Sequence, residues 1–363
     1  MTNALCLTAA LAVAGFLHAA ESTPAKALLV LSKGDHTLSI VDPASLKVIA
    51  SMPSGPDPHE VIATDDGKLA FISNYGGGAY NTLTVVDLLQ QKTTGTIDLG
   101  ALRGPHGLEF AGGKVYFTAE GAKVIGTYDP ASQKIDWVMG TGQDRTHMVW
   151  VNKNLTTIIT SNVSSATMTM LQKVERRMGP PPGGPPPAGM GPGGPPQGGP
   201  GGPPPGGART DWEETIIPVG RGAEGFDVSP DGKELWAANA QDGTISVLDL
   251  TAKKVVATLS PEVRSANRLK FTLDGKHVLV SLLGGPELVI LDAATRQTVK
   301  RLTIGTGAAG IQMAPDGTVA YVACTPDSYV AIIDLNSLEV KGHLQAGKQP
   351  DGLAWVEVRS SHL

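Results

Sequence analysis

The chain has 363 residues, of which 41% are hydrophobic and 17% are charged, and its formal net charge is −5 without any long run of Lys or Arg. This length allows one large or two ordinary domains, and the acidic balance excludes a protein whose main affinity is for nucleic acid. Only two cysteines occur, with no CxxC or CxxCH spacing, which excludes a disulfide scaffold, a zinc ribbon and covalently attached haem.

Residues 1–20 form an apolar run that is too short for a typical membrane-spanning helix and that ends in small residues before Glu21. We interpret this run as a secretory signal peptide, although no Lys or Arg precedes it. No later segment has eighteen uninterrupted apolar residues, so we expect no transmembrane segment. The sequence therefore predicts a periplasmic or extracellular protein.

From residue 26 to residue 356, one pattern recurs about every 43 residues. It consists of a Gly/Pro-containing start, an apolar strand, a DGK-like turn, a second strand, a polar loop and a third strand. The third strands end at Asp42, Asp87, Asp129, Asp249, Asp292 and Asp334. We expect these aspartates to cap hairpin turns through local hydrogen bonds to the backbone.

We predict that each unit is a four-stranded antiparallel blade. The units have alternating β-branched residues and strand-like turn spacing, and they lack a helical period. Seven strand starts predict an all-β fold, a seven-bladed β-propeller. The last start, at residues 350–356, has no second strand after it. We therefore expect it to pair with the strand that begins at Lys26, which would close the ring by joining the two ends of the chain.

The fourth unit is interrupted by residues 178–207, which contain 13 Pro and 13 Gly. A segment of this composition cannot bury a core, so we expect an extended, disordered loop. Two interpretations stay open. The insert is either a tolerated loop extension or a strap that docks a protein partner or the cell wall.

Three second strands, FISN (71–74), WAAN (236–239) and YVAC (321–324), follow SPDGK-like turns. In these motifs the chain resembles the YVTN-repeat, YncE-like seven-bladed propellers over about residues 26–356. One unit, 105–132, resembles a repeat of the streptogramin (virginiamycin B) lyases, which are metal-assisted propellers. The first resemblance implies the fold and says little about function, because propellers host many unrelated activities.

Alignment of the repeats predicts two rings of residues at one mouth of the central channel, because the start of the first strand and the end of the second share a face. The first ring is Asp351, His59, His106, His147, Glu224, Asn267 and Ala309. The second ring is Asn74, Glu120, Asn162, Asn239, Leu282 and Cys324, with the equivalent in the first blade near Ser32 or Lys33. We predict that the asparagines of both rings, together with Asp351, contact a ligand.

Three histidines on consecutive blades, His59, His106 and His147, precede Glu224 in the first ring. Imidazole and carboxylate groups of this kind are ligands of zinc, copper, manganese or iron, so the ring predicts a divalent metal site. With a metal bound, Glu120 or Glu224 would act as the base on an anionic or carbonyl substrate. In the alternative interpretation, each imidazole hydrogen-bonds the backbone of a neighbouring blade.

A cationic side chain lies two or three residues before the strand start in five of the seven blades. These side chains are Arg103, Arg145, Arg221, Arg264 and Lys348. Such a rim could guide and bind an anionic ligand, since the guanidinium group suits bidentate contacts with acids. The alternative is that these charges are exposed and only balance nearby acidic residues.

Three functions follow from these observations, and whether the protein is an enzyme stays open. The first is an exported propeller that binds an anionic ligand or a protein partner at the channel mouth. The second is a metal-dependent, lactonase-like or lyase-like enzyme, and the third is an envelope scaffold that acts through the Pro/Gly-rich insert. No nucleotide-binding motif occurs in a strand-helix context, so we expect neither a nucleotide nor a haem cofactor.

Overall fold

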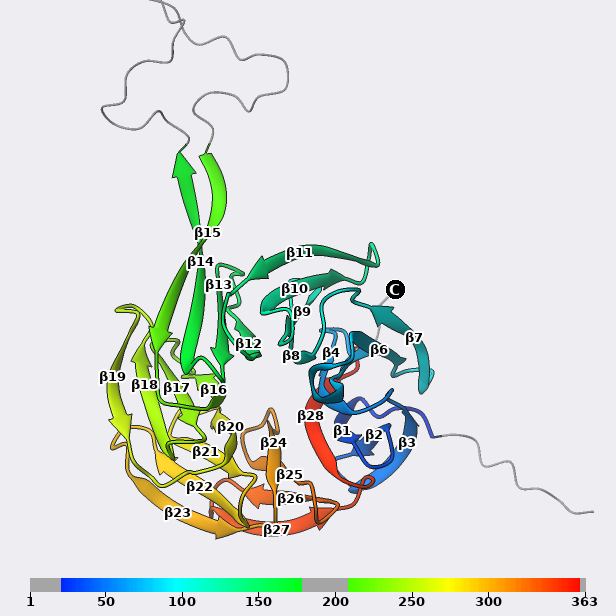
Figure 1. Cartoon of the computed structure of the whole chain (residues 1–363). Coiled ribbons are helices and arrows are strands. Elements are labelled where there is room, and N and C mark those ends of the chain that lie inside the picture. Colours follow the sequence, from blue (N-terminus) through cyan, green and yellow to red (C-terminus); the bar gives the residue numbers. More distant parts are fainter. Residues whose placement is uncertain (1–20, 178–207, 360–363) are drawn as a thin grey trace, which may run out of the picture.

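The computed structural model describes residues 21–177 and 208–359. Within these residues, seven four-stranded antiparallel sheets stand around a central axis, which confirms the predicted seven-bladed propeller (Figure 1). The segments interpreted as a signal peptide (1–20) and as a Pro/Gly-rich insert (178–207) lie outside the described residues. In the part described, no helix has the length and apolar character needed to cross a membrane.

From the axis outward, the first three blades are built as follows. Blade 1 contains β28 (Pro350–Glu357), β1 (Lys26–Ser32), β2 (Thr37–Asp42) and β3 (Lys47–Pro53). Blade 2 contains β4 (Pro58–Ala63), β5 (Leu69–Asn74), β6 (Thr82–Asp87) and β7 (Lys92–Asp98), with a short 3-10 turn, η1 (Gly76–Gly78), after β5. Blade 3 contains β8 (Pro105–Ala111), β9 (Lys114–Ala119), β10 (Val124–Asp129) and β11 (Lys134–Gly140).

The other four blades repeat this plan. Blade 4 contains β12 (Thr146–Val151), β13 (Thr157–Asn162), β14 (Thr167–Arg177) and β15 (Ala208–Pro218). Blade 5 contains β16 (Ala223–Val228), β17 (Glu234–Asn239), β18 (Thr244–Asp249) and β19 (Lys254–Leu259). Blade 6 contains β20 (Ala266–Phe271), β21 (His277–Leu282), β22 (Glu287–Asp292) and β23 (Thr298–Thr303). Blade 7 contains β24 (Ala308–Met313), β25 (Val319–Cys324), β26 (Tyr329–Asp334) and β27 (Glu339–Leu344).

Blade 1 combines strands from both ends of the described chain. The last strand, β28, pairs antiparallel with β1, with Leu28 opposite Trp355 and Leu29 opposite Ala354. The two strands lie side by side in Figure 1, where red meets blue. The backbone groups of β28 are therefore paired within the ring instead of forming an open sheet edge.

The aspartates that end the third strands hold the following hairpin turns, as the sequence predicted. Asp292 accepts a hydrogen bond from the backbone N–H of Thr295 at 2.7 Å, and Asp334 accepts from the N–H groups of Asn336 and Ser337 at 2.9 and 3.0 Å. These hydrogen bonds favour the ionised carboxylate and hold the pKa of both groups below its usual range. These two residues therefore stabilise turns.

Glycine is the third residue of four innermost strands, namely Gly107, Gly225, Gly310 and Gly352. A Cβ atom at any of them would lie inside van der Waals distance of a backbone carbonyl oxygen in the next blade. The innermost strands therefore pack backbone against backbone at this level. Because these four positions carry no side chain, the larger residues at the same level in other blades can extend across the channel.

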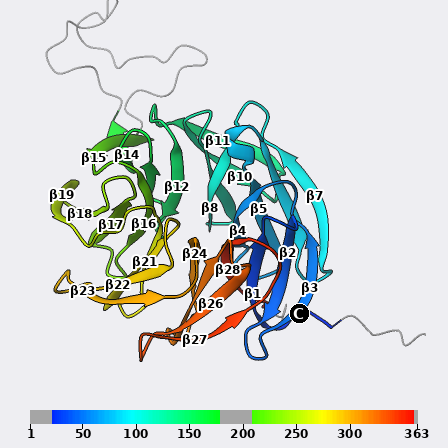
Figure 2. The same ribbon diagram turned by 60° about the horizontal axis from the view of Figure 1, so that its bottom comes forward.

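Blade 4 differs from the others in its two outer strands. β14 and β15 have 11 residues each, where most strands have six or seven, and they pair along their whole length from Thr167 opposite Pro218 to Arg177 opposite Ala208. The ribbon extends beyond the ring in Figure 1, and the rotated view of Figure 2 shows the same two strands at the margin of the ring. Trp212 of β15 packs against Trp137, with ring centroids 5.7 Å apart, which anchors the ribbon to blade 3.

Candidate functional site

The three histidines of the predicted first ring lie together at one end of the central channel, which we call the channel mouth. They are the second residues of the innermost strands β4, β8 and β12. The ring centroid of His106 lies 5.0 Å from that of His59 and 3.8 Å from that of His147. Tyr75, which follows β5, packs edge-on against His59 and His106. The propeller therefore gathers side chains that are far apart in the sequence.

His147 lies between two carboxylates. Its Nδ1 is 2.5 Å from Oε1 of Glu120, and its Nε2 is 3.2 Å from Oε1 of Glu224, without the alignment of a hydrogen bond. The hydroxyl of Tyr75 donates to the other oxygen of Glu120. Arg145 adds a second cation, with Nε 3.5 Å from Glu120 and Nη2 3.8 Å from Glu224.

These contacts set the charges in this half of the mouth. Burial lowers the pKa of His147, but the two carboxylates outweigh it and hold that pKa above its ordinary value. Burial also acts to raise the pKa of Glu224, yet His147 and Arg145 bring it down to about 2. The pKa of Glu120 is lowered in the same way against its own burial. The arrangement is thus an imidazolium held between two ionised carboxylates.

The pKa of His106 is shifted in the opposite direction from that of His147. Burial, followed by the neighbouring imidazoles of His147 and His59, holds the pKa of His106 well below its usual range, so the ring is neutral. Its Nδ1 is buried and has no hydrogen-bond partner in the described structure. Asn267, on the opposite side of the mouth in β20, likewise has a buried Oδ1 without a partner. These two atoms are unsatisfied polar groups within the predicted first ring.

The other half of the mouth is organised around Lys33, which follows β1. Its Nζ lies 2.9 Å from Oδ2 of Asp351 and 3.3 Å from Nδ1 of His59. The Nε2 of His59 lies 3.5 Å from Oδ1 of Asp57. The hydrogen bond to His59 is the main reason that the pKa of Asp57 falls to about 2. Asp351 therefore belongs to an ion-pair network.

Three asparagines of the predicted second ring are buried and link the second and third strands within their own blades. In each, Nδ2 donates to two hydroxyls of the adjacent third strand at 2.9 to 3.1 Å. The pairs are Asn74 with Thr82 and Thr84, Asn162 with Thr167 and Thr169, and Asn239 with Thr244 and Ser246. The structure therefore does not gather them with the histidines. Cys324, on the same ring, is buried, and burial raises the pKa of its thiol to about 12.

The five cations of the predicted rim have different surroundings. Arg145 is the one that reaches the histidine cluster, and 43% of its side chain stays exposed. Arg221 pairs with Asp242 at 2.8 Å, and Arg264 donates to the carbonyl of Gln241 at 2.7 Å. The exposed side chains of Arg103 and Lys348 have no carboxylate within ion-pair distance among the described residues. Both side chains are exposed, and their charge can act on an approaching ligand.

The donors for a metal ion are present at the mouth but are not arranged as a metal site. Within residues 21–177 and 208–359, no group of three or more His, Cys, Asp or Glu has the geometry to hold a metal ion. Both ring nitrogens of His147 face carboxylates, and Arg145 occupies the space beside them. A metal at this point would have to displace the proton of His147 and the guanidinium of Arg145.

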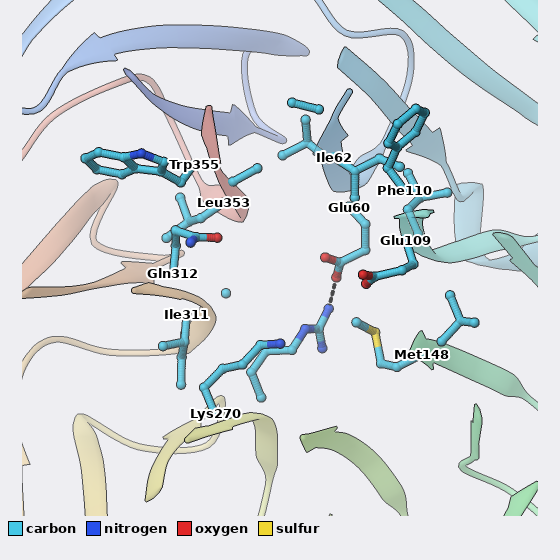
Figure 3. A pocket seen from close by; sticks show the side chains of 17 residues that line it. Glu60, Ile62, Glu109, Phe110, Met148, Lys270, Ile311, Gln312, Leu353 and Trp355 are labelled. Atoms are coloured by element: carbon cyan, nitrogen blue, oxygen red, sulfur yellow. Dashed lines mark hydrogen bonds and ion pairs between the residues drawn. The ribbon is translucent and has the colours of Figure 1, made fainter. Parts of the chain in front are cut away.

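Sequence reasoning missed an ion pair deeper in the channel. Arg268, the third residue of β20, reaches Glu60, the third residue of β4, and the dashed line in Figure 3 marks this pair. Beyond it, on the side away from the histidines, lies a cavity of about 280 Å³, which we call the lower cavity. The repeat alignment contained a signal for this pair. The third residue of the innermost strand is Gly in four blades, whereas in the other three blades it is Glu60, Met148 or Arg268.

Comparison with known proteins supports the fold. Residues 211–311 match the family described as the cytochrome D1 heme domain, a stretch that contains Glu224 and Asn267 but none of the three mouth histidines. No curated protein matches the sequence of this chain.

Several solved structures are similar over almost the whole chain. One is a functionally unknown protein from Desulfotomaculum acetoxidans (TM-score 0.67, 11% identity, 91% of this chain and 99% of that chain). Another is a putative 6-phosphogluconolactonase from Bacteroides fragilis (TM-score 0.66, 13% identity, 93% of this chain and 99% of that chain). A third is a dihydro-heme d1 dehydrogenase (TM-score 0.59, 16% identity, 93% of this chain and 76% of that chain). At these identities the similarity concerns the propeller fold.

Proposed function

We propose that this chain is an exported propeller of the YVTN-repeat type whose channel mouth binds a small hydroxylated acid, such as a sugar acid. The observation that carries the proposal is the pair of unsatisfied buried atoms, Nδ1 of His106 and Oδ1 of Asn267. A buried polar atom without a partner costs about 1–3 kcal/mol. A ligand that supplies a hydroxyl to each atom would recover this free energy.

The charged groups of the mouth suit the acidic part of such a ligand. Arg145 makes only long contacts of 3.5 and 3.8 Å with its carboxylates, so its guanidinium keeps donors for a further acceptor. Lys33 lies across the mouth beside His59. Arg103 and Lys348 on the rim would raise the rate at which an anion arrives. The fold neighbours named as putative 6-phosphogluconolactonases point to the same chemical class, that of sugar-acid derivatives.

Titration calorimetry tests this proposal with gluconate, 6-phosphogluconate and the neutral polyol sorbitol as probes. We expect the two acids to bind, more weakly at high salt, and sorbitol not to bind. His106→Ala and Arg145→Gln should each weaken binding at least about tenfold. Arg221→Gln is the matched control, because Arg221 is already paired with Asp242 on the rim. Equal binding of sorbitol, or an equal loss in the control, would contradict the proposal.

A second candidate is a metal-dependent lactonase-like or lyase-like enzyme in which Glu120 or Glu224 acts as the base. The observation that favours it is the continuous contact from Tyr75 through Glu120 and His147 to Glu224. Elemental analysis of untagged protein from its native compartment tests it. Near-stoichiometric metal that is lost in the His59/His106/His147→Ala variant would support the enzyme.

The absorption spectrum of the same sample tests the expectation that no haem is bound. A Soret band in the purified protein would contradict that expectation and would indicate that the match to the cytochrome D1 heme domain extends to ligand binding.

A third candidate is a scaffold that binds a partner through residues 178–207, which lie between the paired strands β14 and β15 in the sequence. Deleting these residues should abolish a partner interaction while leaving gluconate binding at the mouth unchanged. Export is tested by the N-terminus of the protein recovered from its native compartment, which should begin at residue 21.

A further inference from the structure

The lower cavity differs from the mouth in its lining. Its lining combines apolar side chains, including Phe110, Leu353 and Trp355, with polar groups such as Glu109 and Gln312, which present more of the exposed surface. Its volume of about 280 Å³ is just below the usual range for ligand pockets, roughly 300–1,000 Å³. Figure 3 shows side chains from several blades around this space. The cavity therefore offers a small molecule both apolar side chains and charged groups.

One carboxylate in this lining lacks a partner. Glu109, the fifth residue of β8, lines the cavity, and within the described residues it makes neither an ion pair nor a side-chain hydrogen bond. Burial raises the pKa of Glu109 to about 7, because nearby Lys270 offsets only part of the desolvation. An ionised carboxylate in such surroundings is unfavourable unless a cation joins it.

The charged groups that face Glu109 are already engaged with one another. Lys270 lies 3.8 Å from Asp227, and Arg268 is paired with Glu60. Asp227 also accepts a hydrogen bond from the N–H of Phe271 at 2.9 Å. Asp65, in the turn that follows β4 in blade 2, adds negative charge that raises the pKa of Glu109 further. Because these two ion pairs are each neutral, ionised Glu109 and Asp65 leave an excess of two negative charges near the cavity.

We propose that the lower cavity binds a small organic cation with an apolar body, whose ammonium group pairs with Glu109. The apolar body would lie against the walls that Phe110 and Trp355 supply, and aromatic rings also attract a cation at their faces. The indole N–H of Trp355 is itself buried without a partner, so the lining retains an unused donor. This site lies beyond the Glu60 and Arg268 pair and is independent of the acid proposed for the mouth.

Binding should be coupled to the proton of Glu109. The cation pairs with the ionised carboxylate, which is the minor form below about pH 7. The affinity should therefore rise about tenfold per pH unit up to about pH 7 and then level off. In Glu109→Gln the affinity should be low and independent of pH.

Titration calorimetry with the full chain tests this proposal, with benzylammonium, benzyl alcohol and phenylacetate as probes. Benzylammonium stays charged across this pH range, so any pH dependence belongs to the protein. We expect benzylammonium to bind at least about tenfold more tightly than benzyl alcohol, and Glu109→Gln to remove this preference. Lys270→Met should strengthen benzylammonium binding, because it removes the cation that competes for Glu109.

Two control variants separate this site from general effects on the fold. Glu339→Gln removes an exposed carboxylate on β27 and should leave benzylammonium binding unchanged. His106→Ala should weaken acid binding at the mouth and leave benzylammonium binding unchanged, so the two proposals can fail separately. Equal binding of benzyl alcohol, tighter binding of phenylacetate, or unchanged binding in Glu109→Gln would each overturn the proposal.

Discussion

The two compartments of the central channel differ in how their charges are compensated. At the mouth, His147 and Arg145 face Glu120 and Glu224, and the unsatisfied atoms on which the proposal rests, Nδ1 of His106 and Oδ1 of Asn267, belong to neutral groups. In the lower cavity, the carboxylate of Glu109 has no partner among the described residues. Our two proposals accordingly assign ligands of opposite charge to the two compartments, a hydroxylated acid to the mouth and an organic cation to the lower cavity.

The largest effect should come from breaking the ion pair that separates the two compartments. Arg268→Met leaves the carboxylate of Glu60 buried without its partner, and we expect a loss of about 3–5 kcal/mol in the free energy of unfolding. The double variant Glu60→Gln/Arg268→Met should recover most of this loss, because neither charge is then buried alone. Chemical denaturation measures both, and equal losses in the single and double variants would show that packing, not charge, is responsible.

Removing the cation between the two mouth carboxylates should have the next largest effect. We expect His147→Phe to cost about 2–4 kcal/mol, since two carboxylates lose their imidazolium partner. The raised pKa of His147 gives stability that is complete below pH 6.5 and is lost as the pH rises through the raised value. The lowered pKa of Glu224 gives stability that is present above pH 4.5 and is lost as the pH falls toward 2.

The difference between wild type and His147→Phe should therefore be largest between about pH 4.5 and 6.5. Thermal unfolding across this range measures it. A difference that is constant with pH would mean that the imidazolium does not stabilise the mouth.

In the lower cavity, replacing the charged group Glu109 should increase the free energy of unfolding, whereas replacing His147 or Arg268 should decrease it. The pKa of Glu109 is raised in the folded protein, so ionisation destabilises the fold as the pH rises from 4.5 to about 7. Glu109→Gln should then be more stable than wild type by on the order of 2 kcal/mol at pH 8 and equal to it near pH 4.5. Denaturation at the two pH values measures this, and a destabilised variant at pH 8 would show that Glu109 has a partner.

The smallest effect is expected on the rim. Arg103→Ala and Lys348→Ala remove exposed charges and should each change the free energy of unfolding by less than about 0.5 kcal/mol. They should nevertheless slow the association of 6-phosphogluconate and reduce its dependence on salt. Stopped-flow kinetics at two salt concentrations measure this, with stability as the internal control.

Much of the mouth could be predicted because the repeats place equivalent residues at the same height along the channel axis. The first-ring alignment correctly predicted that His59, His106 and His147 lie together. The second-ring alignment gave the correct height for Asn162 but not the direction of its amide, which points into the blade toward Thr169. Successive strand residues point to opposite sides of a sheet, so height alone cannot assign a side chain to the channel.

The seven blades and the caps on their hairpins could be predicted from the amino-acid sequence, because these features depend on local alternation and turn residues. Which charges meet depends instead on how the blades are arranged around the axis. Glu60 and Arg268 are separated by 208 positions and pair because the ring brings blades 2 and 6 across one axis. Closing the ring likewise placed His147 between Glu120 and Glu224 and left Glu109 without a partner. Their ionisation depends on burial and distance, which no local pattern in the chain specifies.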